Sequence, residues 1–402
     1  EGNVWERGFC SEPSSNSAPP AAGRTYHVNT RSGEVANRII PVGDPARAKR
    51  IAGLLDNPEQ AFSHFSGRQF LTITGTYKGV PVSLVAIGMG IANVDFFVRE
   101  CRAVVRGPMA VIRLGSCGAI DKSTRVGQVV VPDRAVAVTR NYDYFNGYLE
   151  RGRGRDGEAP YVISLPEAAD AELTAALAAE MSRQVGAGNV VTGLDVATDS
   201  FYCSQGRTGD AFYDDNGDLF ETIRARHPEA VSMEMEDHTI FHLANSARPM
   251  PGFDASVRSI RAAAAMIVFA DRTSNEFISA GRVAELESAT GAAVLEAVTK
   301  CDLGVDGSKL HPTEGSVWER SGARPDGTRP CKSSAASPFG PIRRPARAPP
   351  SPAPLPVEFH RVGGTSNRAA LLFYAFKSQP LKPSPKRIPR LPASRALTGH
   401  YS

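Results

Sequence analysis

The chain lacks a hydrophobic run long enough to cross a membrane. Its longest apolar stretch, residues 262–270, falls far short of the roughly 20 residues that a membrane-spanning helix needs. A dominant charge of one sign is also missing, because 46 Lys and Arg residues are balanced by 42 Asp and Glu residues. These absences exclude a helical membrane protein, and we expect no membrane partner.

Cysteine is scarce and irregularly spaced. The six cysteines are Cys10, Cys101, Cys117, Cys203, Cys301 and Cys331. None of them forms the C-x-x-C pair that is typical of zinc sites and redox motifs. Scattered cysteines are typical of reduced thiols in a reducing compartment. We therefore expect a cytoplasmic protein with no disulfide framework and no bound metal.

Proline and charge divide the chain into three segments. Residues 305–402 hold 16 of the 30 prolines and a net charge of +11, whereas residues 24–304 have a net charge of −5. Segments rich in Pro, Ser and charge cannot bury enough apolar surface to offset the entropy of ordering. We expect a disordered lead at 1–23, one domain at 24–304 and a disordered Pro/Arg-rich tail at 305–402. The basic excess belongs to the tail, so it predicts no nucleic-acid partner for the domain.

Apolar segments that alternate with turns predict an α/β domain. The predicted strands are β-branched or small-apolar segments bounded by Gly, Pro or charge, at 38–42, 80–87, 109–114, 127–131, 135–138 and 260–269. The predicted helices lie at 45–55, 92–105, 170–184, 219–227, 236–245 and 282–300. Alternating strands and helices indicate a sheet with helices on its faces. Residues 141–160 are a polar, Gly-rich loop.

A predicted strand, a glycine turn and a helix start follow one another at 38–47. Gly43 lets the backbone approach a ligand, and Pro45 suits the first helical position. The N–H groups of a helix start attract anions. Arg47 opposes the helix dipole in this first turn, and a bound anion would explain its presence. The pattern fits an anion site and an ordinary structural turn equally well.

Two further arginines stand next to apolar segments. Arg68 comes just before a probable strand, and Arg113 lies near the end of the strand at 109–114. The segment Gly115-Ser116-Cys117-Gly118 follows as a Gly/Ser loop. Ligands of α/β sheets bind at the carboxyl ends of strands. A lone arginine is commonly a surface charge, but burying Arg113 without an anionic partner would be costly, so we expect it to bind an anion.

An aromatic residue, an amide and a guanidinium lie close together at 201–207. Phe201 would stack on a planar heterocycle, while Gln205 and Arg207 would pair with its carbonyl and N–H groups. The same residue types suit a surface turn after a strand. Taken alone, they favour the turn.

Carboxylates and another arginine stand at the ends of apolar elements. Glu234 and Glu236 flank Met235 at the start of an apolar helix. The two acids would bind a sugar diol, although acids at a helix start are also favoured by the dipole. Arg272 follows the most apolar strand and again puts a charge at a carboxyl end. His27 is a lone histidine that indicates nothing by itself.

Together these motifs resemble the nucleoside phosphorylase-I family, and within it the uridine phosphorylases. The resemblance extends over residues 25–300 and is carried by five motifs in the family's order, at 42–47, 113–118, 201–207, 234–236 and 271–273. It implies a three-layer mixed β-sheet flanked by helices. It also implies reversible phosphorolysis of uridine to uracil and ribose 1-phosphate, in nucleoside salvage or catabolism. Inorganic phosphate would be the co-substrate, with no cofactor, and the enzyme would be a homo-oligomer with sites shared between subunits.

The resemblance assigns a role to each matched position. The phosphate ligands would be Gly43, Arg47, Arg113 and Ser116, joined by Arg68 of a neighbouring subunit. The ribose would meet Met235, Glu236 and a neighbour's His27, and the uracil would meet Phe201, Gln205, Arg207 and Arg272. The catalytic groups would be Arg113, Glu236 and Arg207, because charge develops on the ribose and on the base as the glycosidic bond breaks.

The chain departs from the family's pattern at four positions. Gln69 replaces a glutamate that helps to bind potassium in bacterial relatives, and Cys117 replaces a hydroxyl residue. Asp237 stands where Ser or Thr is common. Asp271 replaces the asparagine of bacterial uridine enzymes, and purine-specific relatives carry an aspartate near this strand end.

Four functions fit the sequence to different degrees. The residues at 201–207 favour a uridine phosphorylase, whereas Asp271 keeps a purine nucleoside phosphorylase as the alternative. A nucleosidase that uses water would not need the three arginines at 47, 68 and 113. A catalytically silent storage or binding protein on the same fold would not need Glu236.

Overall fold

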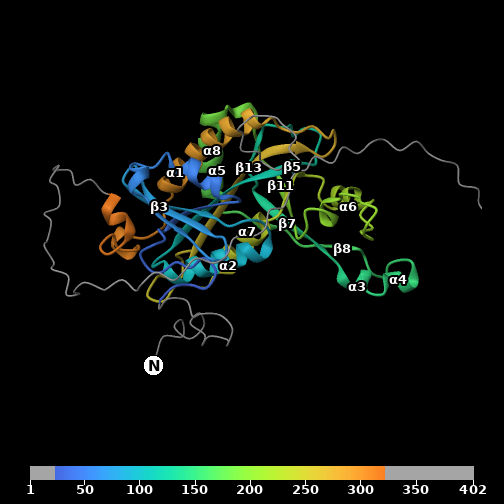
Figure 1. Cartoon of the computed structure of the whole chain (residues 1–402), viewed down its shortest axis with the longest axis horizontal. Coiled ribbons are helices and arrows are strands. Elements are labelled where there is room, and N and C mark those ends of the chain that lie inside the picture. Colours follow the sequence, from blue (N-terminus) through green and yellow to red (C-terminus); the bar gives the residue numbers. More distant parts are fainter. Residues whose placement is uncertain (1–22, 322–402) are drawn as a thin grey trace, which may run out of the picture. The chain divides into compact units, whose positions relative to one another are not determined.

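The computed structural model describes residues 23–321 (Figure 1). Most of the expected lead, 1–23, and of the expected tail, 305–402, lies outside the described residues. The helices are α1 (Pro45–Ala52), α2 (Ile91–Val104), α3 (Tyr142–Phe145), α4 (Tyr148–Arg151), α5 (Ala171–Val185), α6 (Leu219–Arg226), α7 (Asp237–Asn245) and α8 (Ala280–Lys300), with short 3-10 helices η1 (Pro58–Gln60), η2 (Ala187–Asn189), η3 (Cys203–Gln205), η4 (Gly307–Lys309) and η5 (Val317–Ser321). None of these helices combines the length and hydropathy of a membrane span.

The strands form one mixed sheet. They are β1 (Arg38–Val42), β2 (Phe62–Phe65), β3 (Leu71–Tyr77), β4 (Val80–Ala86), β5 (Met109–Ala119), β6 (Val129–Val130), β7 (Arg134–Arg140), β8 (Tyr161–Ile163), β9 (Glu167–Ala168), β10 (Val190–Val191), β11 (Leu194–Thr198), β12 (Ala230–Glu234) and β13 (Ile260–Asp271). The main strand order is β2-β3-β4-β1-β5-β12-β11-β7-β8, and β13 pairs with β5 and β6. The mixture arises because β5 runs parallel to β1 and β13 but antiparallel to β12.

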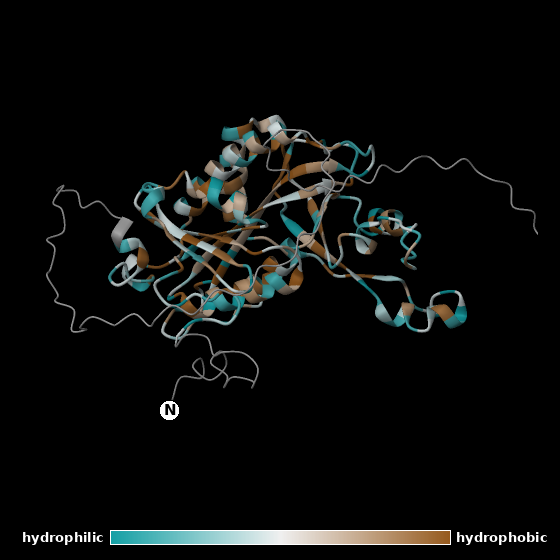
Figure 2. Ribbon diagram, in the orientation of Figure 1, coloured by the Kyte–Doolittle hydropathy of each residue, from teal (hydrophilic) through white to brown (hydrophobic). Residues whose placement is uncertain are grey.

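Helices cover both faces of this sheet, which gives three layers. On one face α1, α5 and α8 share a buried core with the strands, with Ile51, Leu177 and Val294 among its members. On the other face α2 and α7 contribute Phe97 and Phe241 to a second core. Figure 1 shows these two groups of helices on opposite sides of the strands. Hydrophobic colouring is concentrated in the central strands in Figure 2. The expected α/β architecture is confirmed.

The register of the parallel strands brings several strand ends to one place. Val42 of β1 pairs with Ala86 of β4 and with Leu114 of β5. Across β5, Met233 of β12 pairs with Gly118. The turns after β1 and β4, the second half of β5 and the end of β12 therefore lie together. This is the edge at which ligands bind in open α/β sheets.

Most of the predicted elements occur where the sequence places them, and two predicted segments differ in extent or content. The strand expected at 109–114 continues through the Gly/Ser segment to Ala119, because this segment pairs with β13 along its length. The predicted polar loop at 141–160 contains α3 and α4 and extends away from the sheet beyond β7 and β8 (Figure 1).

Residues 305–321 pack on the domain, although the sequence prediction placed them in the tail. The backbone N–H of His311 donates to Asn37 Oδ1 at 3.0 Å, and that of Val317 donates to the Gly33 carbonyl at 2.9 Å. Trp318 is only 2% exposed. The composition of this segment, rich in Pro, Gly and charge, gave no sign that Trp318 anchors it to the domain. Burial of this side chain contributes about 2 to 3 kcal/mol.

Candidate active site

The turn after β1 is built as a helix start. The side chain of Asp44 accepts a hydrogen bond from the Arg47 backbone N–H at 2.9 Å, which caps α1, and Pro45 is the first helical residue. Arg47 is 5% exposed, so its charge is buried close to the helix N-terminus. The Arg47 Nε–H donates to Glu287 Oε1 of α8 at 2.9 Å. This carboxylate offsets the unfavourable position of the arginine in the helix dipole.

Arg113 lies in the middle of β5, and Gly115 makes room for it. A Cβ added to Gly115 would come within 2.0 Å of Arg113 Nη1. The guanidinium therefore lies directly across the glycine on the same face of the strand. The Gly/Ser segment that was interpreted as a loop is a strand. Because Gly115 has no side chain, the Arg113 guanidinium fits in the space beside it.

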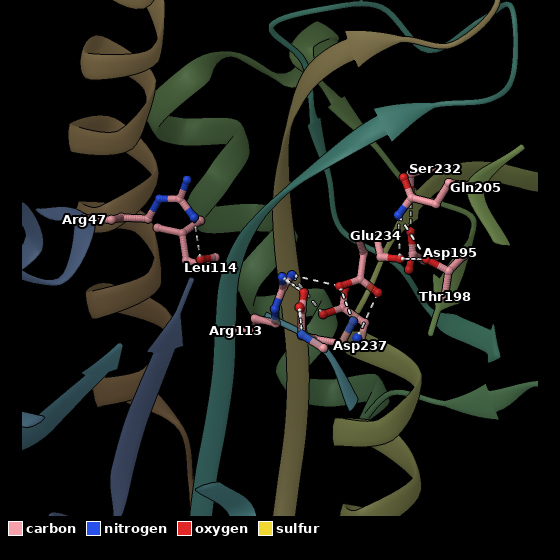
Figure 3. Close-up of polar contacts among 11 residues, drawn as sticks. Arg47, Arg113, Leu114, Asp195, Thr198, Gln205, Ser232, Glu234 and Asp237 are labelled. Atoms are coloured by element: carbon pink, nitrogen blue, oxygen red, sulfur yellow. Dashed lines mark hydrogen bonds and ion pairs between the residues drawn. The ribbon is translucent and has the colours of Figure 1, made fainter. Parts of the chain in front are cut away.

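Three carboxylates surround the Arg113 guanidinium (Figure 3). Its Nη2 donates to Glu236, while Nη1 lies 3.1 Å from Glu234 Oε2 and 3.2 Å from Asp237 Oδ1. All four side chains are at least 95% buried. Glu234 ends β12 instead of opening a helix as expected, and Glu236 is the residue that immediately precedes α7. The strand end and helix start together aim the carboxylates at β5.

Burial and mutual repulsion set the charges of this group. Burial alone would lower the pKa of Arg113, but Glu236 and Glu234 raise it. Burial raises the pKa of Glu236 to about 7, although Arg113 opposes the shift. The pKa of Asp237 is raised by burial to about 6. One guanidinium thus faces an excess of carboxyl groups, and protons balance part of that excess.

Glu236 is also held by the turn after β4. The N–H of Gly90, which has φ of 93° in the left-handed region, donates to Glu236 Oε1 at 2.6 Å. Met235 is half-buried, and its Cε would lie 4.0 Å from a Cβ at Gly90. The methionine and the carboxylate of the 234–236 motif therefore lie beside the same turn. An apolar surface next to a carboxylate is suited to a sugar.

Residues 201–207 form a connected group. Arg207 lies over the Phe201 ring, 3.5 Å from its centroid, and Arg207 Nη1 donates to Gln205 Oε1 at 2.6 Å. Gln205 Nε2 donates to Thr198 Oγ1 at 3.0 Å and to the Glu234 carbonyl at 3.3 Å. The last contact joins this group to the Arg113 carboxylates, as Figure 3 shows. Phe201 is 47% exposed, so part of its side chain is accessible to a ligand.

Arg272 completes this group from the end of β13, and Asp271 points elsewhere. Arg272 Nη2 donates to the Gln205 carbonyl at 2.8 Å. The Asp271 carboxylate accepts hydrogen bonds from Thr273 and Ser274. Burial raises the pKa of Asp271, but these hydrogen bonds together outweigh burial and lower the pKa below its ordinary value. Asp271 is therefore an ionised turn residue.

The remaining predicted residues divide between two places. Ser116 is half-buried on β5, directly after Gly115. Arg68 lies in the turn after β2, where its Nη2 donates to the Tyr26 hydroxyl at 2.8 Å. His27 stacks on Phe96 at 3.7 Å. The ring centroids of Tyr26 and His27 are 4.9 Å apart, so Arg68 and His27 belong to one cluster around Tyr26. This cluster is built on other elements than the Arg113 group.

One group of acidic side chains has the spacing of a cation site within residues 23–321. The carboxylates of Asp195, Glu234 and Asp237 lie within 4.8 Å of one another and are fully buried. Arg113 is 3.1 to 3.2 Å from two of them, and its charge opposes a cation there. Burial and neighbouring carboxylates raise the pKa of Asp195, which favours a shared proton over a metal.

Sequence reasoning missed four residues that support the site. They are Gly90, Asp195, Thr198 and Glu287. Asp195 and Thr198 belong to the short strand β11. An acid within this otherwise mostly apolar segment was the single feature of the sequence that could have indicated a functional residue there. A lone acid on an amphipathic helix, such as Glu287, gives no signal at all.

Comparison with known proteins agrees with this geometry. Residues 37–300 match the model of the phosphorylase superfamily. A uridine phosphorylase of Thermococcus kodakarensis is 31% identical over 260 residues, which cover 64% of this chain and 82% of the relative. A DeoD-type purine nucleoside phosphorylase of Oceanobacillus iheyensis is 29% identical over 221 residues, or 55% of this chain and 80% of the relative. A solved structure from a study of two uridine phosphorylases of the oomycete Phytophthora capsici is 36% identical, with a TM-score of 0.65, over 72% of this chain and 99% of the other.

The chain belongs to the phosphorylase superfamily. Its match spans the whole sheet and both layers of helices, from β1 to the end of α8. Within that superfamily it is a nucleoside phosphorylase, a pentosyltransferase, as the five sequence motifs predicted.

Proposed function

We propose that the protein catalyses the reversible phosphorolysis of uridine to uracil and ribose 1-phosphate. One observation carries the proposal. The Gln205–Arg207 pair, which is suited to the carbonyl and N–H groups of a pyrimidine, is joined through the Glu234 carbonyl to the Arg113–Glu236 pair. An amide, two guanidiniums and a carboxylate are thereby assembled around the places where base, phosphate and sugar would meet.

Phosphate would bind between the β1–α1 turn and β5. Gly43 and the start of α1 offer backbone N–H groups, and Arg47, Arg113 and Ser116 offer side-chain donors. Arg113 and Glu236 influence the pKa of Arg47, so these charges lie within electrostatic reach of one another. Arg68 would come from a neighbouring subunit of a homo-oligomer, which agrees with its place in the separate cluster with Tyr26.

The ribose would lie against Met235, with its 2′- and 3′-hydroxyls donating to Glu236. His27 of a neighbouring subunit would reach the 5′-hydroxyl. The Nδ1 of this histidine is 2.7 Å from Glu100 Oε1, which fixes the ring orientation. Uracil would stack on Phe201 and pair with Gln205, while Arg207 and Arg272 face its carbonyl groups.

Charge stabilisation explains the catalysis. As the glycosidic bond breaks, the ribose becomes positive and the base becomes negative. Glu236 and the phosphate dianion stabilise the ribose, and Arg207 stabilises the base. The chain's own groups are held in place by hydrogen bonds, so they need little reorganisation during the reaction, and such preorganised charge is usually the largest catalytic contribution. Phosphate itself is the nucleophile once it is positioned.

Purine nucleosides are the alternative substrates, because a purine nucleoside phosphorylase is among the relatives. An aspartate that protonates a purine would have a raised pKa and would face the base. Asp271 has a lowered pKa and accepts its hydrogen bonds from the adjacent turn. This difference favours the pyrimidine.

The proposal is tested by a product assay with uridine and inosine, each with and without phosphate. We expect uracil and ribose 1-phosphate from uridine only when phosphate is present. Faster turnover of inosine would replace the proposal by a purine phosphorylase. Equal turnover without phosphate would indicate a hydrolase, and no turnover on either nucleoside would indicate a silent binding protein. Sharing of the site between subunits, and a cytoplasmic location, are part of the same proposal.

A further inference from the structure

One buried carboxylate next to the proposed phosphate site contacts Arg47 but is not among the proposed substrate ligands. Glu287 lies on α8 and is 4% exposed, and it pairs with two arginines of α1, Arg47 and Arg50. Arg50 is partly exposed, with 41% of its side chain accessible, whereas Arg47 is buried. Glu287 could form an ion pair with the partly exposed Arg50 alone. Its additional contact with the buried Arg47 therefore requires an explanation.

The two helices approach closely at this point for a specific reason. A Cβ on Gly291 of α8 would lie 3.0 Å from Ile51 Cγ1 of α1. Gly291 is one turn after Glu287, and Ile51 is one turn after Arg47, so the two pairs face each other across the helix contact. The absence of a side chain at Gly291 lets α8 pack against α1 and brings the carboxylate to the arginine.

Glu287 contacts a particular atom of the guanidinium. Its Oε1 accepts a hydrogen bond from Arg47 Nε at 2.9 Å. Arg47 Nη1 donates to the Leu114 carbonyl on β5 at 3.4 Å, as Figure 3 shows. A hydrogen bond to Nε fixes the plane of the guanidinium but occupies only one of its five N–H groups. Nη1 is thereby directed toward β5, the strand that carries Arg113 and Ser116.

We propose that Glu287 is a positioning residue for phosphate binding. It holds the Arg47 guanidinium so that its Nη edge faces the anion, and it does not touch the anion itself. The inference rests on the proposed phosphate site.

Two effects of Glu287 oppose each other and can be separated. Its negative charge weakens the attraction of an anion, whereas its hydrogen bond orients the arginine. Glu287→Gln removes the charge but keeps an acceptor for Nε–H, and Glu287→Ala removes both. Glu296→Gln is the matched control, because Glu296 lies on the same helix and pairs with Tyr77 and Lys300.

The measurements are the dissociation constant of inorganic phosphate by titration calorimetry and the KM values for phosphate and uridine. We expect Glu287→Ala to weaken phosphate binding about tenfold, the usual effect of one charge-assisted hydrogen bond. Glu287→Gln should remain within about threefold of the wild type, and the KM for uridine should change less than about twofold in both. The control should bind phosphate like the wild type.

Three outcomes would overturn the inference. Tighter phosphate binding by both variants would show that Glu287 competes with the anion by its charge. Unchanged binding by Glu287→Ala would show that Arg47 needs no support. Equal changes of both KM values would indicate a general structural role. If Glu287→Ala does not fold, Glu287→Gln and Glu287→Asp decide between these outcomes: weaker phosphate binding by the aspartate, whose shorter side chain moves the acceptor, supports the inference, and wild-type binding by the aspartate overturns it. A wild-type enzyme that binds phosphate but does not cleave uridine would count against the proposed function alone.

Discussion

The guanidinium of Arg113 occupies the space that a side chain at Gly115 would take, since a Cβ there would lie 2.0 Å from Arg113 Nη1. The two residues are neighbours on one face of β5, so the glycine is a requirement of the arginine. This relationship fixes where the positive charge of the site can lie.

Gly115→Ala should therefore damage the site more than the fold. The methyl group displaces Arg113 from Glu234 and Glu236, and we expect phosphate-dependent turnover to fall by about a hundredfold or more, as for the loss of one preorganised donor. Gly188→Ala is the control, because a Cβ at Gly188 meets nothing within 4 Å. The measurement is kcat/KM together with the melting temperature. Wild-type turnover in Gly115→Ala would refute the assignment of Arg113.

Gln205→Ala should relax the choice of base. The amide of Gln205 is held between Arg207 and Thr198, so its orientation toward a base is fixed. We expect the preference for uridine over inosine to fall at least about tenfold, because one directional hydrogen-bonding group is lost. Gln184→Ala on the exposed side of α5 should leave the preference unchanged. Unaltered selectivity in Gln205→Ala would remove the base pocket from the proposal.

The rate should rise with pH around neutrality. Burial raises the pKa of Glu236 to about 7, and the ionised carboxylate is the form that would accept the ribose hydroxyls. We expect kcat/KM for uridine to increase between about pH 6 and 8. In Glu236→Gln the carboxyl group no longer ionises, whereas phosphate still does. The variant therefore separates the pH dependence of the carboxyl group from that of phosphate. An identical pH profile in the variant would assign the dependence to phosphate.

Asp237→Asn should stabilise the protein at neutral pH. The pKa of Asp237 is raised by burial to about 6, above its ordinary value of 3.8, so the folded state holds this proton more tightly than the unfolded state does. The free energy of unfolding should therefore decrease as pH rises from about 4 to 6, and asparagine should remove that decrease. We expect a gain of about 1 to 3 kcal/mol at pH 7.5 by urea denaturation. Asp210→Asn, at an exposed position, serves as control, and an equal gain there would contradict the explanation.

The elements that the sequence revealed are those with a mostly apolar segment or a long amphipathic pattern. β1 begins and ends where its Ile- and Val-containing segment does, and α8 is recognised from its long amphipathic pattern. β11 and β12 were missed because each has five residues and carries buried polar groups such as Asp195 and Ser232. Such groups are stable inside a sheet only because of partners supplied by other strands, and a single segment does not reveal them.

The candidate site shows the same division. Arg113, Gln205 and Glu236 were predicted individually, and in the structure each of them contacts Glu234. The loop expected at 115–118 is a strand, because glycine was interpreted as a turn signal when it serves as space for a neighbour. Glu287 could not have been found, since its partner is 240 residues away and the helix contact at Gly291 is a property of the fold.

The burial of Trp318 bears on how shortened forms of the protein should be made. A boundary chosen from composition, at residue 304, would delete the buried Trp318 together with η5, which packs on β3 and hydrogen bonds to Gly33. Such a fragment would expose the apolar surface that Trp318 covers and would be prone to aggregate. A fragment that ends after residue 321 keeps Trp318 in place, and crystallisation trials should use this shorter form.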